Sequence, residues 1–327
     1  MARFSANNAL LILSAVLLLG GTAHGASKKG APSKSAASKT AKKPAPTPTP
    51  TPAPLAPGEL PLAAKSAILL DAKSGDILYE KNPDEMQYPA SATKILTALI
   101  VLEEGDLDRI VTIEPEDTKV EPSALEFKPG EQYTRRHLLF ALLLKSANDV
   151  ALALARDNAG NVAAFAEKMN RRAETLGALA SHFTNPHGLH DPHHFTTARD
   201  LAAIARVAMQ HPLFREIVAT PEIGMARGAE WVVLKNHNKL LAMLPGCIGV
   251  KTGYTRPAQQ VLVSSAIRAG KEAISVVMHS DKPGIWNDSK TLLEHAFEKL
   301  GVTPVAVPAV PATPTESKPP AEPAGAK

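Results

Sequence analysis

The sequence has almost no cysteine and lacks the long hydrophobic runs of an integral membrane protein. Cys247 is the one cysteine among 327 residues, which excludes an intrachain disulfide, and we expect it to act as a small apolar side chain. After the N-terminal segment no second long hydrophobic stretch occurs, and the residues after Gly301 show no amphipathic pattern. These absences predict a domain that is held together by an ordinary hydrophobic core.

The chain also lacks a strong charge imbalance outside one segment. Its net charge is +4, but residues 26–57 hold six lysines and no acidic residue, so the rest of the chain sums to −2. The basic surplus therefore belongs to that segment, and we expect no nucleic-acid partner. A lysine-rich segment of this kind is usually a solvated spacer, and a weak contact with anionic wall or membrane surfaces is the alternative.

The first 25 residues have the three parts of a secretory signal. Arg3 supplies positive charge, residues 9–19 are apolar, and Ala23 and Gly25 are small residues at the expected cleavage position. The apolar part is shorter than the roughly 20 residues that cross a bilayer. We therefore expect export to the periplasm or another extracytoplasmic cell-wall compartment, with membrane tethering if the signal is not removed.

Two further segments have compositions that cannot bury a core. Residues 26–58 are rich in Lys, Pro, Ala and Thr, and residues 302–327 are rich in Pro and Ala. We interpret them as a disordered linker and a disordered tail. The signal peptide at residues 1–25 and these two segments leave residues 59–301 as the expected folded domain.

Hydrophobic periodicity in this domain predicts strands, then a run of helices, then strands and a last helix. The expected strands cover residues 67–70, 76–79, 231–234, 249–252, 261–267 and 273–278, and the expected helices cover residues 91–102, 136–145, 150–156, 161–176, 197–209 and 287–300. Residues 106–127 are expected to be extended or irregular. The order does not repeat a strand–helix–strand unit, so it predicts an α+β fold with an inserted helical lobe.

The stretch from Tyr88 to Leu102 contains the first candidate for chemistry. Residues after Ser91 are apolar nearly all round, which predicts a buried helix with Ser91 in its first turn. Because positions three apart share a helix face, Lys94 is expected to hold its amine beside the Ser91 hydroxyl, as a base beside a nucleophile. The helix N-terminus would also favour a developing oxyanion. An isolated Ser-x-x-Lys is usually only a helix-capping serine and a lysine that reaches solvent. Other residues must therefore show whether this pair is catalytic.

Two more short motifs follow in sequence order. Ser146-x-Asn148 falls in a loop between two expected helices, where Asn148 or Asp149 would cap the second helix. Lys251-Thr252-Gly253 falls at the end of an apolar strand. Each motif is weak alone, but the order and the three settings together favour a serine-nucleophile site.

Longer segments around these motifs resemble the serine D-alanyl-D-alanine carboxypeptidases among the low-molecular-mass penicillin-binding proteins. The similar segments are Pro89-Ala-Ser-Ala-Thr-Lys94, Ser146-Ala-Asn-Asp149, Asn185-Pro-His-Gly-Leu189, residues 197–201, Pro212-Leu-Phe-Arg-Glu-Ile217, Asn236-His-Asn-Lys-Leu240 and Gly249-Val-Lys-Thr-Gly-Tyr254. The resemblance implies a β-lactamase/transpeptidase-like fold, with an antiparallel sheet flanked by helices and an inserted helical lobe. It implies no cofactor and no metal.

The resemblance also implies a reaction and its catalytic residues. Ser91 would attack the carbonyl between two D-alanines of a peptidoglycan stem peptide and form an acyl-enzyme, with Lys94 taking its proton. Ser146 would relay a proton to the leaving amine. The backbone N–H groups of Ser91 and Tyr254 would form the oxyanion hole. β-Lactams would be covalent inhibitors that acylate the same serine. A lysine base needs a lowered pKa, which burial and a nearby cation such as Lys251 would provide.

The substrate-binding residues are likewise carried over from the family. Asn148 would bond the substrate amide, and Lys251, Thr252 and Gly253 would lie along the bound peptide, the first two meeting its terminal carboxylate. The chain departs from the family pattern in two places. It has Ala258-Gln259 where relatives have Ala-Gly, and it lacks the usual arginine before the last helix, where Lys282 or Arg256 would substitute.

Four other functions compete with the carboxypeptidase. A murein DD-endopeptidase that cuts D-alanyl cross-links would use the same residues. A class A β-lactamase needs a carboxylate that activates water, and the nearest candidate, Glu167, has the wrong spacing. A metal-binding module would use four histidines of one loop, namely His187, His190, His193 and His194. A non-catalytic wall-binding protein would need no reactive serine at all.

Overall fold

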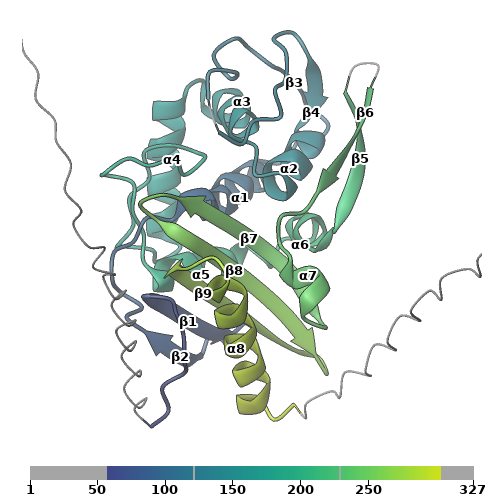
Figure 1. Ribbon diagram of the computed structural model, residues 1–327. Coiled ribbons are helices and arrows are strands. Elements are labelled where there is room, and N and C mark those ends of the chain that lie inside the picture. Colours follow the sequence, from purple (N-terminus) through teal and green to yellow (C-terminus); the bar gives the residue numbers. More distant parts are fainter. Residues whose placement is uncertain (1–56, 121, 228–229, 303–327) are drawn as a thin grey trace, which may run out of the picture. The chain divides into compact units, whose positions relative to one another are not determined.

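The computed structural model describes residues 57–120, 122–227 and 230–302 (Figure 1). The predicted signal peptide at residues 1–25 lies outside the described residues. So do residues 26–56 of the predicted linker and the predicted tail from residue 303 onward. The described residues form one five-stranded sheet, a helical lobe with a short two-stranded ribbon, and a projecting hairpin.

A five-stranded antiparallel sheet with the order β2-β1-β9-β8-β7 lies at the centre. Its strands are β1 (Ser66–Asp71), β2 (Ile77–Lys81), β7 (Cys247–Thr255), β8 (Gln259–Arg268) and β9 (Lys271–Ser280). In β8 and β9 the side chains of both faces are buried in the middle of the strand. Such continuous apolar runs are typical of strands that are covered on both sides. Strand β7 lies at one edge of this sheet.

Helices cover both faces of the sheet. Helix α8 (Gly284–Lys299) packs on one face, where Leu292 and Leu293 join the same buried cluster as Leu262 of β8 and Val277 of β9. Helix α5 (Ala198–Ala208) covers the other face beside α1 (Lys94–Glu104), and their side chains join a second cluster with the opposite faces of β8 and β9. The expected β–helix–β order and the α+β class are therefore confirmed.

Helix α1 is the buried centre of the helical lobe (Figure 1). Every side chain from Ile95 to Leu102 is buried, as its all-round apolar pattern predicts. Around it lie α2 (Arg135–Leu144), α3 (Asn148–Ala159) and α4 (Val162–Thr175). A short antiparallel ribbon of β3 (Ile110–Thr112) and β4 (Gln132–Thr134) packs on this lobe. Strand β3 lies within residues 106–127, which were expected to be extended or irregular, and β4 follows them.

The chain returns from the lobe to the sheet through three elements that the sequence predicted only in part. They are α6 (Pro212–Ala219), the hairpin of β5 (Glu222–Arg227) and β6 (Glu230–Lys235), and α7 (Leu240–Met243). Strand β6 was expected, but β5 was not. Its sequence contains Gly, Met, Ala and charged residues, which have low strand propensity, so pairing with β6 decides its conformation.

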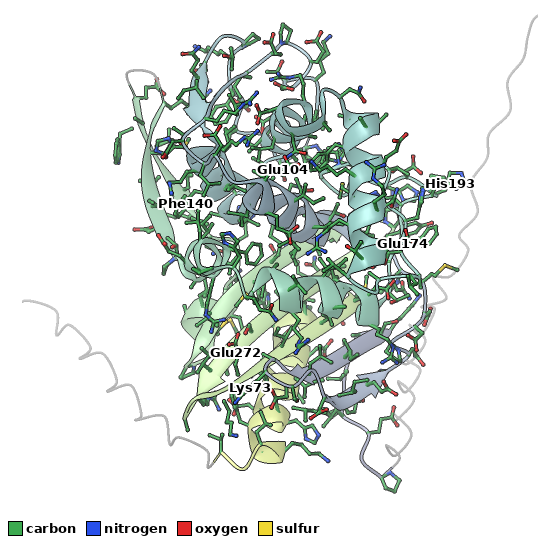
Figure 2. All side chains as sticks on the ribbon, turned by 180° about the vertical axis from the view of Figure 1, so that it is seen from behind. Lys73, Glu104, Phe140, Glu174, His193 and Glu272 are labelled. Atoms are coloured by element: carbon green, nitrogen blue, oxygen red, sulfur yellow. The ribbon has the colours of Figure 1, made fainter. Side chains whose placement is uncertain are left out.

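Segments far apart in the sequence also meet across the sheet. Seen from behind, Lys73 in the β1–β2 turn and Glu272 in β9 lie at the same end of the sheet (Figure 2). The backbone N–H of Ala72 donates to the carbonyl oxygen of Glu272 at 2.9 Å. The antiparallel register of β1 with β9 therefore extends into the turn, and residues about 200 positions apart in sequence are neighbours.

Candidate active site

Ser91 lies in a single 3-10 turn, η1 (Ala90–Thr93), directly before α1. The α-helix therefore begins at Lys94, three residues later than expected, and the serine occupies the tighter turn that leads into it. Ala90 has a positive φ of 47°, and the loop at Gly188 packs against it. A Cβ at Gly188 would lie 1.8 Å from the carbonyl oxygen of Ala90, so only glycine lets this loop hold the serine turn in place.

Lys94 is completely buried and points its amine at the serine. Its Nζ donates to Ser91 Oγ at 3.2 Å, to Asn148 Oδ1 at 2.6 Å and to the carbonyl oxygen of His187 at 2.7 Å. An ammonium group has three N–H donors for these acceptors, whereas a neutral amine keeps two and leaves its lone pair for the Ser91 hydroxyl. The spacing argument for Ser91 and Lys94 thus agrees with the observed contact.

The environment of Lys94 favours its neutral form. Burial lowers the pKa of its amine well below the usual value of 10.5, and the positive charge of Lys251 lowers it further, while the carboxylate of Asp149 acts in the opposite direction. Burial disfavours any charged group, and a second cation adds repulsion. A lysine with a lowered pKa can accept a proton near neutral pH, which an ordinary surface lysine cannot.

A second serine–lysine pair lies in the same cleft. Ser146 follows α2 with a positive φ of 59°, and Lys251 lies in the middle of β7; both side chains are buried. Lys251 Nζ donates to Ser146 Oγ at 3.0 Å and to the carbonyl oxygen of Thr252 at 2.9 Å. Burial lowers the pKa of Lys251 to about 7. The structure thus brings together two hydroxyls and two amines.

Asn148 and Asp149 hold a loop that forms one wall of the cleft. Asn148 Nδ2 donates to the carbonyl oxygen of Pro122 at 2.5 Å, and its backbone N–H donates to that of Ser123 at 2.7 Å. The buried carboxylate of Asp149 accepts from the backbone N–H of Leu125 at 2.9 Å. Neither residue is the N-cap, because α3 begins at Asn148 after an uncapped Ala147, but Asp149 Oδ1 does accept from the first-turn backbone N–H of Val150 at 2.9 Å.

Strand β7 passes directly beside the serine turn. A Cβ at Gly253 would lie 3.0 Å from the backbone nitrogen of Ser91 and 3.1 Å from the carbonyl oxygen of Pro89. The absence of a side chain therefore allows this close approach. Tyr254, the next residue, is 58% exposed at the mouth of the cleft.

The cleft encloses a volume of about 610 Å³. Its lining contains Ser91, Pro122, Ser123, Ser146, Asn236, His237, Lys239, Thr252, Gly253, Tyr254, Gln260, Val261, Lys282, Ile285 and Trp286. Lys282, one of the two substitutes expected for the missing arginine, lies in this lining, and Arg256 does not. No carboxylate occurs among the described lining residues, while cationic side chains do, so the cavity suits an anionic ligand.

Some residues of the cleft were not assigned a role from the sequence. His237 lies in its lining, and burial together with the charges of Lys251 and Lys145 lowers the pKa of its imidazole to about 4. The carbonyl oxygen of His187 binds the buried lysine. His237 falls in a segment singled out by the resemblance, and His187 was considered beyond the resemblance only as a metal ligand. No sequence pattern indicates which backbone carbonyl will accept a hydrogen bond, so this contact could not be predicted from the sequence.

The histidine loop makes hydrogen bonds within the fold. His194 Nε2 lies 2.9 Å from Thr93 Oγ1, and its Nδ1 accepts from the backbone N–H of Thr184 at 3.1 Å. His187 Nδ1 accepts from the backbone N–H of Leu189. In the part of the chain that the structure describes, no three His, Cys, Asp or Glu side chains gather as metal ligands would. The loop instead supports the serine turn.

Glu167, the nearest carboxylate considered for a β-lactamase, lies on α4 and is exposed. It forms an ion pair with Arg171 one turn further along the same helix, at 3.7 Å. Its side chain is absent from the described lining of the cleft. It is therefore not placed to activate water at Ser91.

The fold matches those of solved penicillin-binding enzymes. The crystal structure of the Streptomyces K15 DD-transpeptidase superimposes with a TM-score of 0.70 and 32% sequence identity, over 73% of this chain and 99% of that one. The β-lactamase/transpeptidase-like fold is thus confirmed. The fold and the two serine–lysine pairs define the class as a serine hydrolase of the DD-peptidase type.

The sequence comparisons narrow this class to one family. The family model described as D-alanyl-D-alanine carboxypeptidase matches residues 53–282, and the chain belongs to this family of serine hydrolases. It is 38% identical over 240 residues to the D-alanyl-D-alanine carboxypeptidase DacB2 of Mycobacterium tuberculosis, covering 72% of this chain and 82% of the relative. It is 34% identical over 207 residues to a D-alanyl-D-alanine endopeptidase of Pseudomonas aeruginosa, covering 62% and 66%.

Proposed function

We propose that this protein removes the terminal D-alanine from peptidoglycan stem peptides through an acyl-enzyme on Ser91. The observation that carries the proposal is the contact of Ser91 Oγ with the buried amine of Lys94, at 3.2 Å. A neutral amine at this distance is a general base for the hydroxyl. Residues 59–301 form the proposed catalytic domain, and no cofactor or metal takes part.

Acylation begins with transfer of the Ser91 proton to Lys94. The serine oxygen attacks the carbonyl carbon between the two D-alanines, and the resulting oxyanion lies at the backbone N–H groups of Ser91 and Tyr254. Collapse of this intermediate breaks the peptide bond. The proton that Lys94 took from Ser91 passes to the leaving amine through Ser146, whose hydroxyl is bonded to Lys251 at 3.0 Å, so free D-alanine departs and Lys94 is neutral again.

Deacylation reverses the roles at the serine. A water molecule attacks the ester carbonyl while Lys94 takes one of its protons, and the proton returns to Ser91 Oγ as the ester bond breaks. The product is a peptide that is one residue shorter and ends in a new carboxylate. Because the described cleft lining has no carboxylate to activate water further, β-lactams are proposed to acylate Ser91 and leave slowly.

Three groups are proposed to bind the substrate's terminal carboxylate. Thr252 and the exposed Lys282 lie in the lining that contains Ser91, and Lys251 is bonded to Ser146 of the same lining. Gly253 keeps the strand close enough for a peptide to lie along it. Asn148 holds Lys94 and Pro122 with both ends of its amide, so its proposed role combines substrate binding with positioning of the base.

The test is hydrolysis of a soluble pentapeptide ending in D-Ala-D-Ala, with the products identified by mass. We expect release of one D-alanine by the wild-type protein and none by Ser91→Ala. Labelling by a fluorescent penicillin should occur on the wild type and disappear in Ser91→Ala. An unlabelled wild-type protein would support the non-catalytic wall-binding alternative.

A murein DD-endopeptidase is the second candidate. It is supported by the endopeptidase relative of Pseudomonas aeruginosa, and it needs the same catalytic residues. Digestion of a cross-linked muropeptide dimer beside the pentapeptide separates the two activities. Monomers from the dimer, with the pentapeptide left intact, would favour the endopeptidase.

We also propose export to the periplasm or an equivalent wall compartment. The support is the signal-like composition of residues 1–25, since peptidoglycan lies outside the cytoplasm. Among the described residues, no helix is both long enough and apolar enough to cross a bilayer. The lysines of residues 26–57 are proposed to make a weak contact with anionic wall or membrane surfaces. N-terminal sequencing of the exported protein would test signal removal.

A further inference from the structure

The hairpin of β5 and β6 presents a flat apolar strip to solvent. On its outward face Trp231 is 71% exposed and Val233 is 49% exposed. The residues paired with them across the hairpin are Ala226 and Gly224, which are too small to cover them. The inward side chains of the two strands, such as Leu234, are buried against the domain. The outward face is therefore an open surface with one large aromatic ring.

Trp231 is held in place by a glycine on the neighbouring strand. A Cβ at Gly224 would lie only 2.4 Å from Cζ2 and Nε1 of the indole, so the ring rests against the glycine backbone and any other residue would displace it. The indole N–H has no acceptor among the described residues. The ring thus offers solvent both an apolar surface and a free hydrogen-bond donor.

The strip continues into the cleft. Strand β6 ends at Lys235, and Asn236, His237 and Lys239 directly after it line the cavity that contains Ser91. The five-residue step from Trp231 to Asn236 spans about 17 Å of strand. A stem peptide of about five residues has the same maximum reach, about 17 Å. The length of a stem peptide is therefore comparable to the length of the strand that joins the cleft lining to Trp231.

The chemistry of the strip suits a sugar chain better than a bilayer. A sugar ring has an apolar face of C–H groups and a rim of hydroxyl and amide groups, which match an aromatic face and a free N–H donor. Only two large apolar side chains of the described hairpin residues are exposed, and at the cleft end of the strip Glu222 and Lys235 form an ion pair at 3.8 Å. The described part of the hairpin therefore has a small apolar strip and no basic cluster of the kind that binds an anionic membrane surface.

We propose that the outward face of the β5–β6 hairpin, centred on Trp231, binds the glycan strand to which the stem peptide is attached. The occupant is a polymer of N-acetylated amino sugars, and this inference rests on the proposed carboxypeptidase function. The hairpin positions polymeric substrate, while the chemistry stays at Ser91. It therefore acts on the affinity for glycan-linked peptide and leaves the reaction of free peptide unchanged.

The kinetic test compares Trp231→Ala with the wild type on two substrates. On a soluble pentapeptide kcat/KM should be unchanged, whereas on the same peptide linked to glycan strands it should fall about fivefold through KM, the size of one aromatic contact. Leu179→Ala is the matched control, because Leu179 is 76% exposed and lies in the loop after α4, away from the hairpin. Equal values for wild type and Trp231→Ala on the linked substrate overturn the proposal.

A binding test keeps the inference separate from the proposed activity. The chain has two tryptophans, so in a Trp286→Phe background the emission reports Trp231 alone. Glycan oligosaccharides freed of peptide should shift this emission, and they should do so even if the protein cleaves no pentapeptide. No shift with oligosaccharide overturns the proposal. A shift with phosphatidylglycerol vesicles instead assigns the strip to a membrane and also overturns it.

Discussion

Lys94 and Lys251 are two fully buried lysines behind one cleft, and each donates to the hydroxyl of a serine that lines it. The charge of Lys251 is one of the causes that lower the pKa of Lys94, after burial itself. The cleft therefore disfavours two ammonium ions at once. Lys94 can therefore accept a proton, and the charge of Lys251 helps to keep its amine neutral.

Replacing Lys94 by alanine should remove activity and leave the fold intact. Without the amine no base takes the Ser91 proton, and loss of a general base lowers kcat by about 10² to 10⁴. Pentapeptide hydrolysis gives the rate, and circular dichroism gives the fold. Lys73→Ala, at the far end of the sheet, is the control. Near-normal turnover in Lys94→Ala would rule out its role as base.

Replacing Lys251 by methionine should move the acid limb of the pH–activity profile to higher pH. The neutral amine of Lys94 is the active form, so kcat/KM rises as pH passes upward through its pKa. Removing the charge of Lys251 lets that pKa rise toward 10.5, and the rise in activity occurs at higher pH. The pH profile of kcat/KM for the pentapeptide measures this shift. Loss of carboxylate binding changes the height of the profile, whereas the pKa of Lys94 sets the pH of its acid limb. A limb that stays in place would contradict the coupling.

Replacing Asp149 by asparagine should move the acid limb of the pH–activity profile to lower pH. The carboxylate raises the pKa of Lys94, so its loss lowers that pKa and extends activity to lower pH. The variant should also be less stable by about 1–3 kcal/mol, because a charged acceptor for buried backbone N–H groups is weakened. Asp157→Asn removes a different buried carboxylate, one paired with Arg135, and should destabilise the protein without moving the limb.

Replacing Lys282 by methionine should raise KM for the pentapeptide by about threefold to tenfold, the effect of losing a partly screened contact between charges. Its side chain lines the cleft, so it can meet the substrate carboxylate. Arg256→Met is the matched control, since Arg256 lies outside the lining, and its KM should not change. If Arg256→Met raised KM and Lys282→Met left it unchanged, Arg256 would be the residue that binds the substrate carboxylate.

The sequence was sufficient for features that depend on local spacing and composition. The apolar pattern after Ser91 predicted a buried helix, and the three-residue step placed Lys94 beside the serine. It was not sufficient for contacts between distant segments. The 3-10 turn at Ser91 depends on the loop at Gly188, and strand β5 depends on its partner β6. Asn148 and Asp149 were expected only to cap a helix, because most of their partners, on Lys94 and in the loop at residues 122–125, lie more than 20 positions away.

The position of β7 at the edge of the sheet affects how the enzyme can bind a peptide. An edge strand offers unpaired backbone groups, which elsewhere recruit unwanted chains. Here Gly253 brings that edge against the serine turn. A peptide that pairs with this edge would be bound through its main chain, so stem peptides with different middle residues could share one protein.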